Sequence, residues 1–148
     1  MEIELKPINE QDIDFLYGLL KEREGIVNIS HKELPPFSEH EQFVKSSPYP
    51  YWDIILLNNE RIGNIYLTDR DELGIFISRD FQNQGLGSKV LQNIMVLAIN
   101  DNAHKITLSA RLTALNLYKN QGFSECGTAY KSPKTGVKHV KMQYIVNT

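Results

Sequence analysis

The sequence predicts an α/β (α+β) protein in which a mixed, mostly antiparallel central sheet of about seven strands is flanked by about four helices. Three observations support this prediction. Short segments alternate apolar and polar side chains, as strands do, and longer segments repeat apolar residues at helical spacing. Strand-like segments dominate the first half, whereas helices and strands alternate in the second. The 148 residues are predicted to form a single domain over 1–148.

The N-terminal segment is predicted to contain a strand followed by a helix. Residues 2–8 alternate apolar and polar side chains, which is typical of a strand. Residues 9–24 carry apolar side chains at helical spacing, and Asn9 and Asp12 are placed to cap the start of this helix. The apolar stripe of the helix consists of Ile13, Leu16, Leu19 and Leu20.

Residues 25–50 are predicted to be largely irregular, because four prolines interrupt any long element. Between these prolines, residues 38–46 predict a short helix. Ser38 and Glu41 stand in the spacing of a capping box at its start.

Residues 51–78 predict an antiparallel meander of three strands. The segments 51–59 and 61–69 are strand-like and are joined by the turn Asn58-Asn59-Glu60. The segment "ELGIFIS", residues 72–78, is the third strand.

The second half is predicted to alternate helices and strands. A helix follows Gly85, residues 104–110 form a strand, and a helix over 112–121 ends at Gly122. Two strand-like segments, 123–130 and 139–146, close the chain as a hairpin. The stripe of the helix after Gly85 consists of Leu86, Val90, Leu91, Ile94 and Leu97.

Composition narrows the class of protein. Hydrophobic residues make up 41% and charged residues 23%, as in soluble globular proteins. The net charge of -2 gives no basic face for nucleic acid, and no run approaches the roughly 18 apolar residues of a membrane span. The single cysteine, Cys126, has no internal disulfide partner, and the polar start is unlike a signal peptide. We therefore expect a cytoplasmic protein.

The segment "QNQGLGSKV" places Gly85, Gly87 and Ser88 at the start of a helix that follows a strand. Unpaired amides and partial positive charge at a helix N-terminus attract phosphate, and glycine leaves those amides open to a ligand. A Walker loop requires a different glycine spacing, with lysine directly before serine or threonine. A dinucleotide fingerprint requires a third glycine where Val90 stands. A glycine-rich turn that caps an ordinary helix is the structural alternative.

The pattern Gln82-x-x-Gly85-x-Gly87 resembles the acetyl-CoA pyrophosphate loop of the GNAT superfamily of N-acetyltransferases. The segment "LYKNQGF", residues 117–123, is similar to the tyrosine-bearing helix end of that superfamily. The predicted elements also follow the superfamily's order over about 2–146. The resemblance implies the GNAT (acyl-CoA N-acyltransferase) fold and an acyltransferase that uses acetyl-CoA as co-substrate and needs no metal.

The resemblance also implies where the cofactor lies. The pantetheine arm is expected beside the strand 72–78 and to pair with backbone groups of Phe76 and Ser78. Arg111 stands where members often carry an asparagine, so it is either a contact for a CoA phosphate or a surface arginine at a helix start. The residues predicted to bind the cofactor are Phe76, Ile77, Ser78, Gln82, Asn83, Gln84, Gly85, Leu86, Gly87, Ser88 and Arg111.

Two residues are implied to be catalytic. Tyr118 is expected to protonate the departing thiolate, although a half-buried aromatic on a helix is the structural alternative. Glu72 stands where relatives often keep a carboxylate that acts as a base through water, whereas an exposed glutamate at a strand end is usually only solvated.

Residues 25–50 are expected to help form the pocket for the acceptor amine. We predict His31, His40 and Trp52 as substrate-binding residues, because this region resembles that of GNAT proteins acting on nucleotide-linked amino sugars. Core packing of the aromatics and solvation of the polar groups is the alternative. A protein N-terminus, a polyamine and an antibiotic are competing acceptors, and a CoA-binding sensor is the non-enzyme alternative. Homodimers are common among relatives, and the sequence does not decide the oligomeric state.

Overall fold

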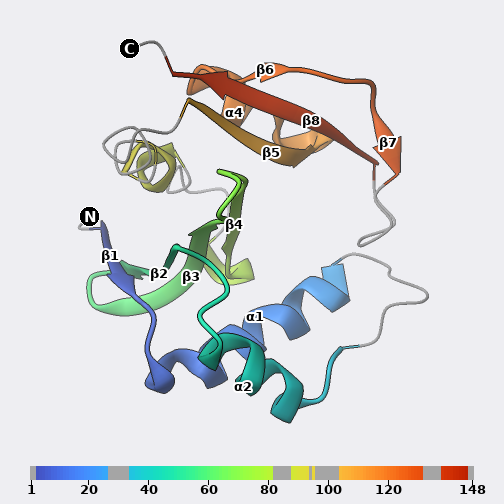
Figure 1. The fold of residues 1–148 in the computed structure, drawn as a ribbon. Helices are drawn as coiled ribbons and strands as arrows, with labels where there is room; N and C mark the ends of the chain where they lie inside the picture. The colour runs from blue at the N-terminus through green and yellow to red at the C-terminus, as the bar shows by residue number, and fades with distance from the viewer. Residues whose placement is uncertain are drawn as a thin grey trace.

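The computed structural model describes residues 3–26, 34–81, 88–93, 95, 104–131 and 138–146. Their strands form two four-stranded sheets with helices packed against them (Figure 1). The strands are β1 (Ile3–Pro7), β2 (Tyr51–Leu57), β3 (Glu60–Leu67), β4 (Leu73–Ile77), β5 (Lys105–Arg111), β6 (Ser124–Glu125), β7 (Tyr130–Lys131) and β8 (Lys138–Ile145). The helices are α1 (Ile13–Ile26), α2 (Phe37–Lys45) and α4 (Leu115–Asn120), and residues 88–93 are also helical.

The first helix begins with the predicted caps. The Asn9 side chain accepts a hydrogen bond from the Gln11 N–H at 2.8 Å, and the Asp12 carboxylate accepts one from the Asn9 N–H at 2.9 Å. Asp12 is fully buried and forms ion pairs with Arg61 and Lys6. Burial alone would raise the pKa of Asp12, but the bonds from Asn9, Arg61 and Lys6 together lower it. This carboxylate therefore ties the start of α1 to β1 and β3.

The capping box predicted for the second helix is wrong. The helix α2 begins at Phe37, its N-cap is Pro36, and no side chain caps it. Pro36 has an extended backbone, with φ -57° and ψ 147°, so the helix starts directly after it. Ser38 consequently lies inside the helix, where a cap is not needed.

The predicted meander is confirmed. Strands β2 and β3 pair in antiparallel register, and β3 pairs with β4 in the same way. Asn58 and Asn59 form the turn with φ values of 51° and 69°, a left-handed conformation that asparagine tolerates. The hairpin therefore has the tight geometry that two asparagines favour.

The second half follows the predicted order but forms its own sheet. The strand order is β5–β8–β6, and β7 also pairs with β8. The helix α4 ends before Gly122, whose φ of 98° suits the residue after a helix. The predicted mixed, mostly antiparallel fold with flanking helices is confirmed, and its described strands lie in two sheets that meet at β4 and β5. Of the helix predicted after Gly85, residues 86, 94 and 97 lie outside the described part of the chain.

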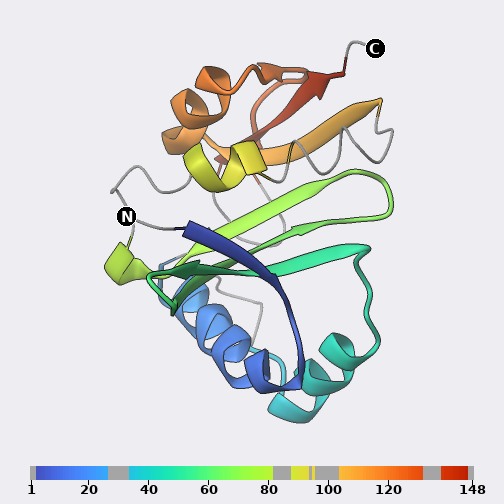
Figure 2. The same cartoon turned by 90° about the vertical axis from the view of Figure 1, so that its left-hand side faces the viewer.

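Two hydrophobic clusters hold the layers together. The larger cluster lies between the two sheets and joins residues of the helical segment 88–93 and of α4 to both. The smaller cluster packs α1 and α2 against the face of the first sheet that points away from the second sheet (Figure 2). The first sheet therefore has one face toward the second sheet and α4 and one face toward α1 and α2. Within the described residues, no helix is both long and apolar enough to cross a lipid bilayer.

Candidate active site

The two sheets meet along β4 and β5, which run parallel. The Thr107 N–H donates to the Asp71 carbonyl at 3.0 Å, and Glu72 and Thr107 form an isolated parallel bridge. Beyond this bridge β4 continues in the first sheet and β5 in the second. Ligands of α/β proteins bind where parallel strands separate at their carboxyl ends. The fold therefore places a candidate site at the separation of β4 and β5, called here the β4–β5 opening.

Tyr118 lies on α4, directly after β5. Its side chain is 9% exposed and packs edge-on against Phe123, with ring centroids 6.1 Å apart. Burial raises the pKa of Tyr118, and the positive charge of Arg111 opposes this rise only in part. The phenol is therefore protonated at neutral pH, which is the state that a proton donor requires.

Arg111 ends β5 and is the cross-strand partner of His139. Its positive charge counteracts part of the rise that burial causes in the pKa of Tyr118. The contact predicted between Arg111 and a CoA phosphate stays a prediction.

The structure corrects the predicted backbone pairing along β4. The Ser78 N–H donates to the Ile62 carbonyl at 2.7 Å, and the Ser78 carbonyl accepts from the Phe81 N–H at 2.9 Å. Backbone groups of a strand alternate in direction, so those of Phe76 also point toward β3. The prediction that Phe76 and Ser78 pair with a pantetheine arm is therefore wrong. The backbone groups of Ile75 and Ile77 point the other way, toward the side of β5.

The Ser88 hydroxyl is held at the start of the helical segment 88–93. The Gln121 side chain at the end of α4 donates a hydrogen bond to Ser88 Oγ at 2.7 Å. This bond leaves the hydroxyl hydrogen of Ser88 available to an acceptor such as a phosphate. Gln121 was not predicted from sequence, because its partner lies on a different element. The predicted loop residues Gln82, Asn83, Gln84, Gly85, Leu86 and Gly87 lie outside the described residues.

Glu72 lies at the point where the two sheets join. Its backbone N–H donates to Thr68 Oγ1 at 3.1 Å, and its carbonyl accepts from the Thr68 N–H at 2.9 Å. The side chain is exposed. Its position beside Thr107 puts it at the base of the β4–β5 opening, and its role as a base stays a prediction.

The residues predicted to bind the acceptor are not brought together. His31 lies outside the described residues. Trp52 donates from Nε1 to Asn64 Oδ1 at 2.9 Å and belongs to an aromatic cluster with Tyr49 and Tyr66, whose rings stack 4.3 Å apart. His40 is 6% exposed and packs between α1 and α2, with its ring 5.3 Å from that of Tyr17. Its burial in the helix packing favours a structural role.

His40 is expected to make folding stability depend on pH. Burial lowers its pKa below the usual 6.5, although a bond to the Ile13 backbone opposes this, and its buried Nε2 has no partner among the described residues. Below about pH 6.5 His40 binds a proton more readily in the unfolded chain than in the folded protein. The free energy of unfolding therefore falls as pH decreases toward the pKa of His40 in the folded protein. Urea unfolding at pH 7.5 and 5.5 should show a smaller pH effect in His40→Gln. An equal effect in both proteins contradicts this assignment.

A polar cluster that sequence reasoning missed lies on the second sheet. Ser109 Oγ shares hydrogen bonds with the Tyr130 hydroxyl and, at 3.1 Å, with His139 Nδ1. The three residues come from β5, β7 and β8. His139 is 8% exposed, whereas Tyr130 is 41% exposed. The cluster therefore leads from the surface to a buried imidazole.

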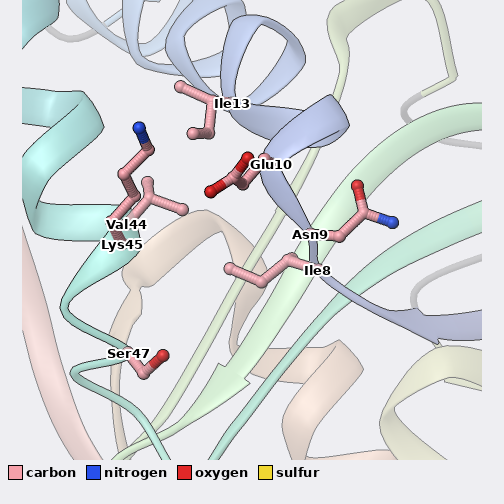
Figure 3. Close-up of a pocket in the computed structure, with 7 residues that line it drawn as sticks. All are labelled: Ile8, Asn9, Glu10, Ile13, Val44, Lys45 and Ser47. Carbon is pink, nitrogen blue, oxygen red and sulfur yellow. The ribbon is translucent and has the colours of Figure 1, made fainter.

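A shallow pocket of about 240 Å³ lies elsewhere, between the start of α1 and the end of α2 (Figure 3). It is lined by Ile8, Asn9, Glu10, Ile13, Val44, Lys45 and Ser47. None of the predicted site residues that the structure describes lines it. Among the described residues, no group of three histidine, cysteine or acidic side chains is arranged to hold a metal ion.

Diverging parallel strands, followed by a helix with a buried and protonated tyrosine, are the features expected of an acyl-CoA-dependent transferase. The family model described as "Acetyltransferase (GNAT) domain" matches residues 29–146. The chain therefore belongs to the GNAT acetyltransferase family, and the predictions of an acyltransferase and of acetyl-CoA as its co-substrate are confirmed. A search of curated protein sequences finds no match.

Solved structures share this fold over nearly the whole chain. Spermidine N-acetyltransferase from Vibrio cholerae, in complex with CoA and spermine, is 19% identical, with a TM-score of 0.82 and coverage of 97% of this chain and 95% of that one. A ribosomal-protein-alanine N-acetyltransferase from Brucella melitensis is 16% identical, with a TM-score of 0.79 and coverage of 99% and 100%. A GNAT acetyltransferase from Streptococcus pneumoniae is 20% identical, with a TM-score of 0.74 and coverage of 99% and 100%. At these identities the likeness establishes the fold and leaves the acceptor open.

Proposed function

We propose that this protein transfers an acetyl group from acetyl-CoA to a primary amine by direct attack in a ternary complex. The observation that carries the proposal is the position of Tyr118, a buried and protonated phenol on the helix that follows the β4–β5 opening. Holding the two substrates in near-attack geometry supplies several kcal/mol of the barrier, up to about 7–11 in ideal cases.

The cofactor is proposed to lie on the α4 side of the opening. Backbone amides of residues 83–88 bind the diphosphate, and the Ser88 hydroxyl donates to it while it accepts from Gln121. The pantetheine arm runs along β4, on the side toward which the backbone groups of Ile75 and Ile77 point. This geometry brings the sulfur to Tyr118, which donates its proton to the departing thiolate.

The acceptor is proposed to be a nucleotide-linked amino sugar. The aromatic cluster of Tyr49, Trp52 and Tyr66 offers ring edges to a sugar or base, and the cations Arg111 and Lys141 lie on the outer face of the second sheet. The positive charges of a polyamine would be repelled by these two cationic side chains. A protein N-terminus and a polyamine remain the competing acceptors, since structures similar to this chain include enzymes for both.

A thiol-release assay with acetyl-CoA tests the proposal on a panel of amines. The panel contains UDP- and TDP-linked amino sugars, spermidine and a short peptide with a free N-terminus. Turnover of an amino-sugar nucleotide supports the full proposal. Turnover of spermidine or of the peptide alone supports acetyl transfer and shows that the acceptor belongs to that class of amine instead of the amino-sugar nucleotides. CoA binding without turnover of any amine would contradict the enzymatic proposal.

A further inference from the structure

We propose that Ser109, Tyr130 and His139 form the proton-accepting relay for the acceptor amine. This inference rests on the proposed function and names the group that performs the base's role, in place of Glu72. The three side chains are joined by two hydrogen bonds, through Ser109 Oγ. A hydrogen-bonded chain from an exposed hydroxyl to a buried imidazole is an arrangement through which a proton can pass.

The strand register places this cluster on the face of the opening opposite to α4, where we place the amine. Glu72 and Thr107 are bridge partners, so alternate residues of β4 and β5 from these positions onward share one face. On β4 this face holds Phe76, which packs with α1 and α2. On β5 it holds Ser109, two residues beyond the last contact between the strands. The Ser109 hydroxyl is therefore near the start of the separation, on the face opposite to α4.

The cluster and Tyr118 flank β5 from its two sides. The neighbours Leu108 and Ala110 point into the core that contains Tyr118. Ser109 points the opposite way and bonds to His139, whose cross-strand partner Arg111 influences the Tyr118 phenol. A thioester carbonyl in the opening would thus have a proton donor on the sulfur side and a proton acceptor on the amine side. Acyl transfer to an amine requires this division of roles.

The proton balance is complete within the reaction. The acceptor ammonium gives a proton to an oxygen of the relay, a hydroxyl proton moves on, and the neutral imidazole of His139 receives one at Nδ1. The amine then attacks the carbonyl carbon, the carbon–sulfur bond breaks, and Tyr118 protonates the thiolate. The amide nitrogen loses its second proton to the Tyr118 phenolate, and His139 releases its proton to water.

Charged and titratable groups face His139 from the neighbouring strands. Arg111 faces it from β5, Tyr130 faces it from β7, and Lys141 lies two residues further along β8 on the same face.

The test compares Ser109→Ala and His139→Gln with the wild type in the thiol-release assay. The probe is the amine of the panel that the wild type acetylates best, assayed from about pH 7 to about pH 9. At pH 7 we expect kcat/KM to fall about 10²-fold, at the lower end of the contribution of a general base. The loss should shrink as pH rises, since a smaller share of the amine then needs deprotonation.

Matched variants separate the relay from structural effects. Ser124→Ala, an exposed serine on the neighbouring β6, should leave kcat/KM and its pH profile unchanged. Glu72→Gln should not reproduce the pH-dependent loss. A loss of the same size at every pH, an unchanged kcat/KM in the relay variants, or a pH-dependent loss in Glu72→Gln alone would overturn the relay while wild-type turnover upholds acetyl transfer. Absence of wild-type turnover on the whole amine panel, with CoA bound, would overturn both.

Discussion

Replacing Tyr118 by phenylalanine is expected to lower kcat about 10²-fold, at the lower end of the effect of a general acid. The phenol is protonated because burial raises its pKa, and phenylalanine removes the proton that the departing thiolate needs. The loss is limited because a thiolate leaves tolerably well without protonation. Steady-state kinetics with the best amine of the panel would measure this change.

The Tyr118→Phe variant keeps the ring that packs on Phe123, so the thermal unfolding midpoint should stay close to that of the wild type. CoA affinity, measured by calorimetry, should also be retained, because the phenol acts on the sulfur during transfer. A normal kcat would contradict the role as proton donor. A large loss of CoA binding would instead assign Tyr118 to cofactor recognition.

Local features of this fold could be predicted because neighbouring residues determine them. Asn9 and Asp12 cap α1 through hydrogen bonds that span two or three residues. The Asn58–Asn59 turn needs only residues that tolerate positive φ. The failure at Ser38 has the same local origin, since Pro36 starts the helix two residues earlier than the capping-box spacing implies. Sequence patterns are most reliable where a single turn decides the conformation.

Features that join distant segments could not be predicted. Apolar periodicity identifies β4 and β5 as strands, but it does not show that they meet at Glu72 and Thr107 and then enter separate sheets. The resemblance supplied Tyr118, because "LYKNQGF" is contiguous. The polar cluster of the second sheet has no such signal, since its members stand on three strands and meet only through the register of β8.

The direction of backbone groups explains the error along β4. Sequence resemblance located the strand beside the cofactor but left open which alternate residues point toward β3. The bond between Ser78 and Ile62 decides this, because all residues of the same parity on β4 must then face β3. A shift of one residue thus moves the proposed cofactor contact from Phe76 and Ser78 to Ile75 and Ile77.

Replacing Gly63 by alanine is expected to destabilise the protein by about 3 kcal/mol, at the upper end of the usual cost of overpacking. A Cβ at this position would lie 2.4 Å from the Phe76 carbonyl oxygen and 2.9 Å from the Ile77 Cα. Both are backbone atoms of β4, so a change of side-chain rotamer cannot relieve the clash. Gly63 pairs with Ile55, next to the irregular register between Ile55 and Leu56. To make room for the added Cβ, β3 has to move away from β4. Urea unfolding would measure the change.

Gly18→Ala is the matched control, because no atom of the described residues lies within 4 Å of a Cβ at that position in α1. Alanine should stabilise the helix by about 0.5–1 kcal/mol relative to glycine, so the same substitution has opposite signs at the two sites. Displacement of β4 would also widen the β4–β5 opening, so Gly63→Ala should lower CoA affinity even where it remains folded. If both variants gained stability, the close approach of β3 and β4 at Gly63 would be incorrect, and the strand that is proposed to guide the cofactor would lose its fixed position.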